Sequence, residues 1–491
     1  MSESIETLKP SEVILNSVKA KGWRKSVYIA ATMAAVGGFV CGYDTGAVAG
    51  IMVMPTFQDS FPEFSDPTQF AYLEGLLVAF MLMTAALGAF FSGPICDRIG
   101  RKRSIILGSY IFALGILFEI IGFKFGLLLT GRLVAGFGNG LMTNAVPLYH
   151  SEIAPPDIRG RLVSLFTLMS TFGQVVGYFV TFGTSYVDNA WGWRGPWLLQ
   201  LIVCIILGTS VFFLPFSPRW LIDQGREEEG LAVICELQEA PADDPGVKAE
   251  YDEIKAELDL EKSMGKRTYS ELFSKANRKR TYIAFFIAIA TSFTGIDAIL
   301  YYGPSIFMDA GLSDISSSIA ASGATGIVSL IASFVALICI DKLGRKFLFI
   351  LGSVVMGISM FITGAMFQVY AYIDPDSGSV VMTNVAARNA IMAFIFIFMA
   401  AFSLTWGVVS YVYPAEIFNM RCRAKGLGLT YGLNWAFSIL ITYVMPLFMA
   451  TTLSGSYFFF GACCAVMTVV IFFIPETRQR TLESMEEIFH E

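Results

Sequence analysis

The sequence predicts an all-α integral membrane protein with twelve transmembrane helices, in two six-helix pseudo-repeats joined by a cytoplasmic helical linker. Composition is the first reason, because 55% of the 491 residues are hydrophobic and only 15% are charged. Soluble domains carry about a quarter charged residues, so this chain must place much of its apolar surface in lipid. The second reason is a series of apolar runs, and the third is a set of motifs that occurs twice.

Twelve apolar runs are long enough to cross a bilayer, which takes about 20 residues of helix. They lie at 27–50, 70–94, 104–122, 126–149, 161–184, 195–214, 281–308, 317–340, 347–370, 389–413, 425–449 and 455–474. Six precede and six follow a charged stretch. We therefore expect an N-terminal tail at 1–24, a first half at 25–215, a linker at 216–280, a second half at 281–475 and a C-terminal tail at 476–491.

Basic residues orient the predicted helices. Of the 34 Lys and Arg residues, Lys124, Arg194 and Arg388 lie in the loops of one side, and Arg132 lies within a span. The rest lie at the termini or in the alternate loops, and basic loop residues concentrate on the cytoplasmic side of membrane proteins. Both termini and the linker are therefore predicted to be cytoplasmic.

The linker mixes charged residues with good helix formers, as in the run from Glu250 to Leu258. This composition favours short amphipathic helices, with a break between Pro241 and Gly246. The high charge density is also compatible with a disordered linker, which is the alternative interpretation.

Charged motifs recur at corresponding places in the two halves. The repeated residues are Asp97 and Arg101 after the second run, Asp341 and Arg345 after the eighth, Glu152 and Arg159 after the fourth, and Glu416 and Arg423 after the tenth. Two halves of one design, with a site at their interface near the midplane, are typical of transporters that work by alternating access.

These eight repeated charges are predicted to lie at the same membrane face. We expect them to form a cytoplasmic gate of salt bridges that is closed when the protein faces outward and opens when it faces inward. Exposed ion pairs suit such a switch, because each contributes only about 1 kcal/mol or less. The alternative is that the charges only set the membrane topology.

Several motifs together resemble one known family. They are the paired Asp-x-x-Gly-Arg-Lys loops, Ser217-Pro-Arg-Trp-Leu221, Pro475-Glu-Thr-Arg478 with Thr481-Leu-Glu483, and Thr294-Gly-Ile-x-Ala with Tyr301-Tyr302. The combination resembles the sugar porter family of the major facilitator superfamily over nearly the whole chain, and is most similar to fungal hexose and fructose carriers. The resemblance implies a major facilitator fold, a monosaccharide substrate, facilitated diffusion or proton symport, and the plasma membrane as location.

A sugar site needs hydrogen-bond donors and acceptors to replace water, and an aromatic face for the C–H side of the ring. Polar side chains inside the predicted spans supply both, since such groups turn towards a cavity or another helix. The candidates are Thr167, Gln174, Ser292, Asp297, Ser329, Trp406, Asn434 and Trp435. Ordinary polar helix packing is the alternative for these residues.

By the resemblance, these are the family's sugar-contact positions, and several of them are changed. The family usually has glutamine at Thr167, a glutamine pair at Thr291 and Ser292, and asparagine at Asp297 and at Ser329. A site built on specific hydrogen bonds discriminates strongly, so changed donors should change the preferred sugar. We therefore expect a monosaccharide, with fructose favoured over glucose; a pentose, a polyol or another hexose is the alternative.

Two further charges lie within spans, Asp44 in the first and Arg132 in the fourth. Lone charges in lipid are costly, so the two are expected to pair. Arginine keeps its proton, which makes Asp44 the titratable partner. Bacterial sugar–proton symporters of the family resemble this arrangement, so the pair favours proton coupling. A static ion pair in a facilitative uniporter is the alternative.

Other classes of protein are disfavoured. The chain has only two histidines and no nucleophile–base or metal-type spacing, so no catalytic residue, metal or cofactor is predicted. The net charge of −6 does not suggest nucleic acid. A transporter-like sugar sensor is a less favoured alternative, because only about sixteen residues follow the last run. The expected partners are the sugar, protons and membrane lipid, with a monomer as the functional unit.

Overall fold

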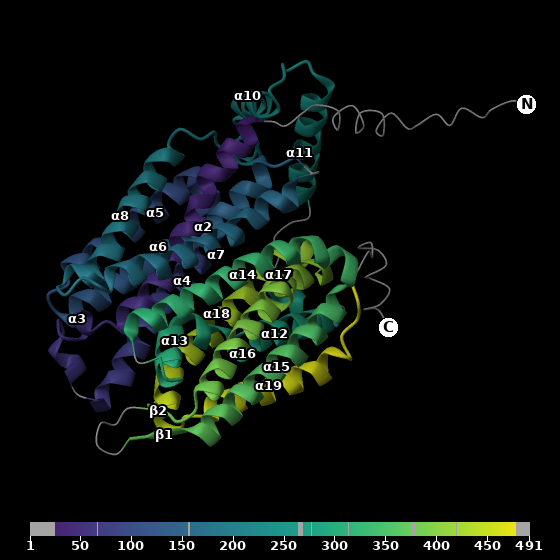
Figure 1. Cartoon of the computed structure of the whole chain (residues 1–491). Coiled ribbons are helices and arrows are strands. Elements are labelled where there is room, and N and C mark those ends of the chain that lie inside the picture. The colour runs from purple at the N-terminus through teal and green to yellow at the C-terminus, as the bar shows by residue number, and fades with distance from the viewer. Residues whose placement is uncertain are drawn as a thin grey trace, which may run out of the picture.

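The computed structural model describes residues 25–65, 67–155, 158–263, 269–275, 277–312, 314–374, 380–418 and 420–477. These segments are almost entirely helical, in two bundles that lie side by side with three linker helices at one end (Figure 1). The predicted N-terminal tail and residues 478–491 of the predicted C-terminal tail lie outside the described residues.

The first half contains six long helices. They are α2 (Lys25–Met52), α4 (Pro67–Ile99), α5 (Arg101–Ile121), α6 (Phe125–Ile153), α7 (Arg159–Thr184) and α8 (Trp191–Val211), with the short α3 (Pro55–Gln58) and η1 (Pro62–Ser65) after α2. All six coincide with predicted runs.

The second half also has six spans, and two of them are broken. Its elements are α12 (Arg278–Phe293) with α13 (Ile296–Asp309), α14 (Ile315–Leu343), α15 (Arg345–Tyr370), α16 (Val385–Leu404) with α17 (Trp406–Ile417), α18 (Met420–Thr451) and α19 (Gly455–Ile471). The hairpin of β1 (Ala371–Ile373) and β2 (Val380–Met382) joins α15 to α16. The prediction of a twelve-helix fold is confirmed.

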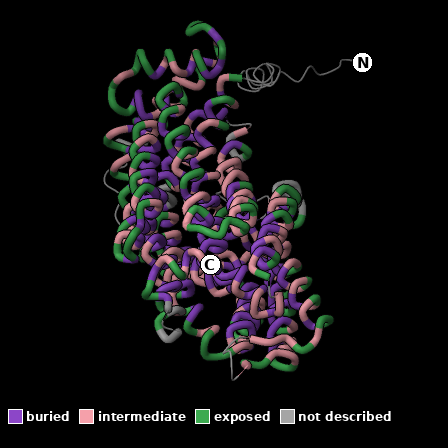
Figure 2. The backbone as a smooth tube through the Cα atoms, turned by 60° about the vertical axis from the view of Figure 1, so that its left-hand side comes forward, coloured by how far each residue is buried: buried purple, intermediate pink, exposed green. Residues whose placement is uncertain are grey.

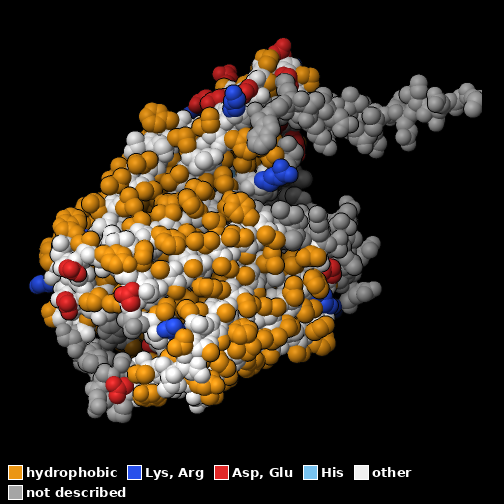
Figure 3. All heavy atoms as spheres, in the orientation of Figure 1, with side chains coloured by type: hydrophobic (Ala, Val, Ile, Leu, Met, Phe, Trp, Pro, Cys, Tyr) orange, Lys and Arg blue, Asp and Glu red, His pale blue; other side chains and the backbone are white. Residues whose placement is uncertain are grey.

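Side-chain distribution agrees with a membrane environment. Eleven of the described spans are long and apolar enough to cross a bilayer, and α19 is a shorter apolar helix. On the face shown in Figure 3, hydrophobic side chains cover the middle of the molecule and charged ones gather near its ends. Buried residues line the interior of both bundles (Figure 2).

The linker forms three helices, α9 (Pro218–Asp223), α10 (Glu227–Gln238) and α11 (Pro245–Ser263), followed by η2 (Tyr269–Phe273). Ile234, Val247 and Leu258 belong to a small separate hydrophobic cluster in this region. A linker with its own packed core is helical rather than disordered, as the helix-forming composition predicts. We call the end of the bundle beside α9–α11 the linker end, and the opposite end the far end.

Glycines hold α2 tightly against α7. A Cβ atom at Gly38, Gly42 or Gly46 would come within 2.3, 1.8 or 2.2 Å of a carbonyl oxygen of α7. These glycines recur every four residues and so share one face of α2, the pattern by which membrane helices approach closely. The contact fixes α2 and α7, which both carry candidate site residues.

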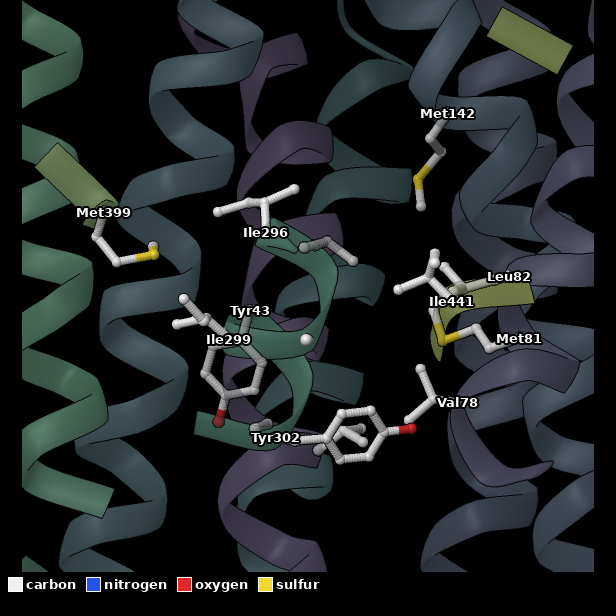
Figure 4. Packing of buried hydrophobic residues seen from close by; sticks show 14 of the residues in the cluster. Tyr43, Val78, Met81, Leu82, Met142, Ile296, Ile299, Tyr302, Met399 and Ile441 are labelled. Atoms are coloured by element: carbon white, nitrogen blue, oxygen red, sulfur yellow. The ribbon is translucent and has the colours of Figure 1, made fainter. Parts of the chain in front are cut away.

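The two halves are packed together at the far end. There the hydroxyl of Tyr178 in α7 donates to the carbonyl oxygen of Leu300 in α13 at 2.6 Å, and the hydroxyls of Ser185 and Ser316 lie 2.9 Å apart. A second contact between the halves joins α4 to α18, where Met81 and Leu82 of α4 lie near Ile441 of α18 (Figure 4).

At the linker end, the same two helices have separated. A Cβ atom at Gly75 of α4 would lie 2.8 Å from the carbonyl oxygen of Tyr443 in α18, so the helices touch there. Gly93 lies eighteen residues further along α4, which is five turns, and therefore on the same face. Outside the local turn of its own helix, no atom of the described residues lies within 4 Å of a Cβ at Gly93, or at Gly432 of α18 three turns before Tyr443. Among the described residues, the two halves thus touch at the far end, and α4 and α18 are apart at the linker end.

Candidate functional site

The break between α12 and α13 centres the second half of the site. Gly295 has a φ of 91°, in the left-handed region that glycine tolerates, and a Cβ there would lie 2.8 Å from the ring of Phe460. The break places Asp297 in the first turn of α13, where free backbone N–H groups favour a carboxylate. Asp297 is half-buried, and the hydroxyl of Ser438 in α18 donates to its Oδ2 at 2.5 Å.

Short polar side chains surround this break. Asn434 in α18 donates through Nδ2 to the Ser292 hydroxyl at 3.1 Å and to a backbone oxygen of α12 at 2.9 Å. The hydroxyl of Thr291 donates to Ser410 of α17 at 3.0 Å. Asn434 lies four residues before Ser438 and so on the same face of α18. The structure therefore brings Ser292, Asn434 and Asp297 together, with the hydroxyls of Thr291 and Ser292 already engaged.

The predicted aromatic residues differ in their exposure. Trp406 opens α17 after the break at Thr405 and is fully buried, with Nε1 donating to Ser353 at 2.9 Å and to the carbonyl oxygen of Phe349 at 3.1 Å. Its N–H is therefore used inside the second half. Trp435 is only partly buried, next to Asn434 in α18.

Ser329 lies in α14, and 4% of its surface is exposed. Its hydroxyl has no hydrogen-bond partner among the residues that the structure describes. Since a buried hydroxyl without a partner is costly, this group is available to a ligand or to water.

Two candidates lie on α7 of the first half. Thr167 is exposed, and Gln174 is buried beside the side chain of Tyr178. Gln174 stands one turn before Tyr178, and Asp297 stands one turn before Leu300, the residue that Tyr178 contacts. Because α7 and α13 both run from the linker end to the far end, Gln174 and Asp297 lie at similar depth on facing helices.

Asp44 and Arg132 lie together inside the first half. Nη1 of Arg132 contacts Oδ2 of Asp44 at 2.9 Å and Oδ1 at 3.1 Å. Gln200 of α8 adds a third contact, from its Nε2 to Asp44 Oδ1 at 3.3 Å. The guanidinium also lies 5.4 Å from the ring of Trp197. The pair joins α2 to α6.

The charge pair and the polar cluster are neighbours across the two halves. Thr45, next to Asp44 on α2, meets the side chain of Tyr301 on α13. Tyr301 lies one helical turn after Asp297. A movement of α13 against α2 would therefore change the surroundings of both Asp44 and Asp297.

The predicted gate residues form ion pairs within each half. In the first half, Nε of Arg101 lies 2.9 Å from Oε2 of Glu152, and Nη1 lies 3.4 Å from Asp97. In the second half, Nη2 of Arg345 lies 2.8 Å from Oε1 of Glu416. Both clusters are formed although α4 and α18 are apart at this end.

The side chains of Arg159, Asp341 and Arg423 lie outside the described residues. The described ion pairs join residues of the same half. The gate therefore stays a prediction, and the pairs that are described act to hold each half together.

Sequence reasoning missed two residues beside Arg132. Glu119 of α5 is fully buried, with Oε2 3.3 Å from Nη2 of Arg132, and Gln200 contacts Asp44. Glu119 was detectable, because it is the one acidic residue in the predicted span 104–122, the criterion that singled out Asp44. Gln200 carried no such signal.

No group of three or more His, Cys, Asp and Glu side chains is placed to hold a metal ion within the described ranges. The residues gathered around the breaks and around Arg132 offer hydrogen bonds and proton sites. This chemistry suits the binding of a polar solute.

Comparison with known proteins places this chain among sugar transporters. Residues 30–489 match the family described as "Sugar (and other) transporter". Hexose transporter HXT9 of Saccharomyces cerevisiae is 32% identical over 468 residues, covering 94% of this chain and 82% of the yeast protein. Sugar transport protein MST7 of Oryza sativa is 29% identical, covering 95% of this chain and 91% of its own length.

Solved structures agree on the fold. The inward-open conformation of the xylose transporter XylE from E. coli has a TM-score of 0.77 at 24% identity, and covers 94% of this chain and 99% of its own. XylE bound to 6-bromo-6-deoxy-D-glucose, described as a proton:xylose symporter of the major facilitator superfamily, has a TM-score of 0.75 at 25% identity, covering 95% of this chain and 100% of its own.

Proposed function

The chain belongs to the sugar porters of the major facilitator superfamily, and on that premise we propose that it imports a monosaccharide together with a proton, by alternating access. The proposed substrate is a hexose, with fructose favoured over glucose. The proposed working unit is a monomer in the plasma membrane, with both termini and the linker end in the cytoplasm. The described conformation is then the inward-facing one.

One observation carries the coupling proposal. Asp44, which accepts from Arg132 at 2.9 Å, is followed by Thr45, which contacts Tyr301 on the helix of Asp297. Sugar binding that pulls on the first turn of α13 would therefore act on the helix that holds the Asp44–Arg132 pair. Weakening the pair would favour proton binding to Asp44, because a buried carboxylate without a counter-ion prefers its neutral form.

The substrate proposal rests on the acceptors and donors that remain after internal bonding. Thr291 and Ser292 bond to Ser410 and Asn434, so they are not free to replace a pair of amides. Asp297 then serves as a charged acceptor. A site of this kind selects sugars by the placement of their hydroxyls, since an unmatched buried polar group costs strongly.

Gln174 and Trp435 complete the proposed sugar site from two sides. Gln174 supplies a buried amide from the first half, and Trp435 a partly buried aromatic side chain from the second. Thr167 extends the face of Gln174 towards the linker end. Trp406 contributes by fixing α17, because its N–H is already bonded within the second half.

A facilitative carrier is the second candidate, and one observation favours it. Both oxygens of Asp44 accept hydrogen bonds from Arg132, and Gln200 adds another, so the pair is satisfied as a static structural element. In such a carrier, Asp44 would stay ionised through the whole cycle.

Uptake of labelled sugars in a yeast strain without hexose transporters separates the candidates. The proposal predicts that fructose is taken up faster than glucose, and that a protonophore abolishes accumulation. Sugar added to de-energised cells should also make the medium more alkaline. Uptake that ignores the protonophore and gives no proton signal would establish a uniporter.

A further inference from the structure

Arg132 is contacted by two carboxylates rather than one. Its Nη1 lies 2.9 Å from Asp44 Oδ2, and its Nη2 lies 3.3 Å from Glu119 Oε2. The side chains of Arg132, Asp44 and Glu119 are 1%, 3% and 0% exposed, so water screens none of them. Arg132 of α6 thus supplies one positive charge to two buried acids, Asp44 of α2 and Glu119 of α5.

Charge balance requires one of the two acids to hold a proton. An unpaired ionised carboxylate in a dry interior is far less stable than its neutral form. Among the described residues, the charged groups that face Glu119 are Arg132 and Asp44. The neighbouring side chains of α8 and α4 around Arg132 are neutral, namely Gln200, Trp197 and Met81.

The hydrogen bonds indicate which acid is neutral. Asp44 accepts from Arg132 on both oxygens and from Gln200 on one, as an ionised carboxylate would. Neither oxygen of Glu119 has a hydrogen-bond partner in the described part of the chain. The hydrogen bonds therefore favour Asp44 as the ionised acid and Glu119 as the neutral one.

Glycine makes room for the second acid. A Cβ atom at Gly131, next to Arg132 in α6, would lie 2.7 Å from Cγ of Glu119. Without a side chain at this position, Glu119 packs directly against the backbone that carries Arg132. The approach of Glu119 to the guanidinium thus depends on a specific contact between α5 and α6.

We propose that Glu119 is a second proton-binding residue, and that Glu119 and Asp44 alternate as the ionised partner of Arg132. When Asp44 is ionised and paired, as here, Glu119 holds the proton. When the proton moves to Asp44, Arg132 pairs with the ionised Glu119. The three groups then keep one proton and no net charge in both arrangements, so the exchange buries no unpaired charge.

The positions of the acids give the exchange a direction. Glu119 lies two residues, about 3 Å, from the far end of α5, whereas Asp44 lies eight residues, about 12 Å, from the far end of α2. Release of a proton from Asp44 towards the linker end is then balanced by uptake of a proton at Glu119 from the far end, so that Arg132 never faces two ionised acids. This direction rests on the proposed proton-coupled import.

Infrared spectroscopy of the full-length protein in lipid nanodiscs tests the proton site without any transport. We expect a carbonyl stretch of a protonated carboxylic acid that shifts when the protein contains ¹³C-carboxyl glutamate. Glu119→Gln should remove the component of this band that Glu119 contributes, whereas Glu74→Gln, at another buried acid in α4, should leave that component in place. If Glu119→Gln fails to fold, Glu119→Asp takes its place. The band of the protonated acid at this position should then no longer shift with labelled glutamate, because the acid is an aspartate. A band unaffected by both changes at Glu119, or one that only labelled aspartate shifts, overturns the proposal.

Transport in proteoliposomes separates this inference from the proposed function. Glu119→Gln should lower sugar-driven proton uptake about tenfold or more, the effect of moving a proton-binding equilibrium by one pKa unit. Sugar exchange at equal concentrations should remain. Unchanged proton uptake in Glu119→Gln contradicts the exchange with Arg132. Absence of proton uptake in the wild type instead overturns symport, while the infrared band still decides whether Glu119 is protonated.

Discussion

Replacing Asp297 with asparagine tests the proposed sugar site most specifically. The change keeps the size of the side chain but removes its charge and turns one acceptor oxygen into a donor. We expect Asp297→Asn to weaken fructose transport and to shift the preference towards glucose, because the charged acceptor is what departs from the family pattern. Ser438, which donates to the carboxylate at 2.5 Å, should still bond to the amide oxygen.

The size of the effect follows from the hydrogen bonds involved. A bond to a charged group contributes about 1.5–3 kcal/mol, and one between neutral groups about 0.5–1.5 kcal/mol. Losing the charge at one sugar hydroxyl therefore costs about 1–1.5 kcal/mol, which is about a five- to tenfold loss in kcat/KM.

The assay is initial uptake of labelled fructose and glucose, each normalised to the amount of carrier in the membrane. Glu74→Gln is the matched control, since it makes the same acid-to-amide change at a buried acid within a span that is not among the proposed sugar-site residues. Unchanged fructose kinetics and an unchanged fructose-to-glucose ratio in Asp297→Asn would refute the assignment of Asp297 to the sugar site.

Three further substitutions probe the architecture around the site. Gly295→Ala should destabilise the protein by about 2–5 kcal/mol, from the left-handed backbone and the contact with Phe460, and thermal unfolding in detergent measures this; an unchanged unfolding temperature would contradict the strained break. Arg101→Ala should impair transport at normal membrane abundance, because the first half loses its ion pairs, and normal transport would leave the pairs a topological role only. Tyr178→Phe removes the hydrogen bond to Leu300. It should lower the free energy of opening the far end by about 0.5–1.5 kcal/mol, which raises the population of the open state roughly two- to tenfold. Faster thiol labelling of a cysteine introduced at that end checks it, and equal labelling rates would show that the bond does not hold the halves closed.

The spans were predictable because each is a long, local and apolar pattern. A bilayer requires about 20 apolar residues whatever the tertiary contacts, so the twelve runs could be located from composition alone. The breaks inside two spans were less accessible. Gly295 is visible as a weak point in a helix, but its positive φ depends on the packing of Phe460, which lies 165 residues away.

Site residues were predictable by type and not by contact. Asp44, Arg132 and Asp297 attract attention because each is a charge at membrane depth. Whether a tryptophan such as Trp406 exposes its N–H depends on Phe349 and Ser353, two helices away, and no spacing reveals this. Glu119 had a local signal, but its significance came only from the 3.3 Å contact with Arg132.

Proton-coupled import is the central claim, and sugar-driven proton uptake into proteoliposomes tests it most directly. The wild type should take up protons when fructose is added on the outside, and Asp44→Asn should abolish this uptake while leaving sugar exchange. Fructose transport without proton uptake in the wild type, or equal proton uptake in Asp44→Asn, would contradict it.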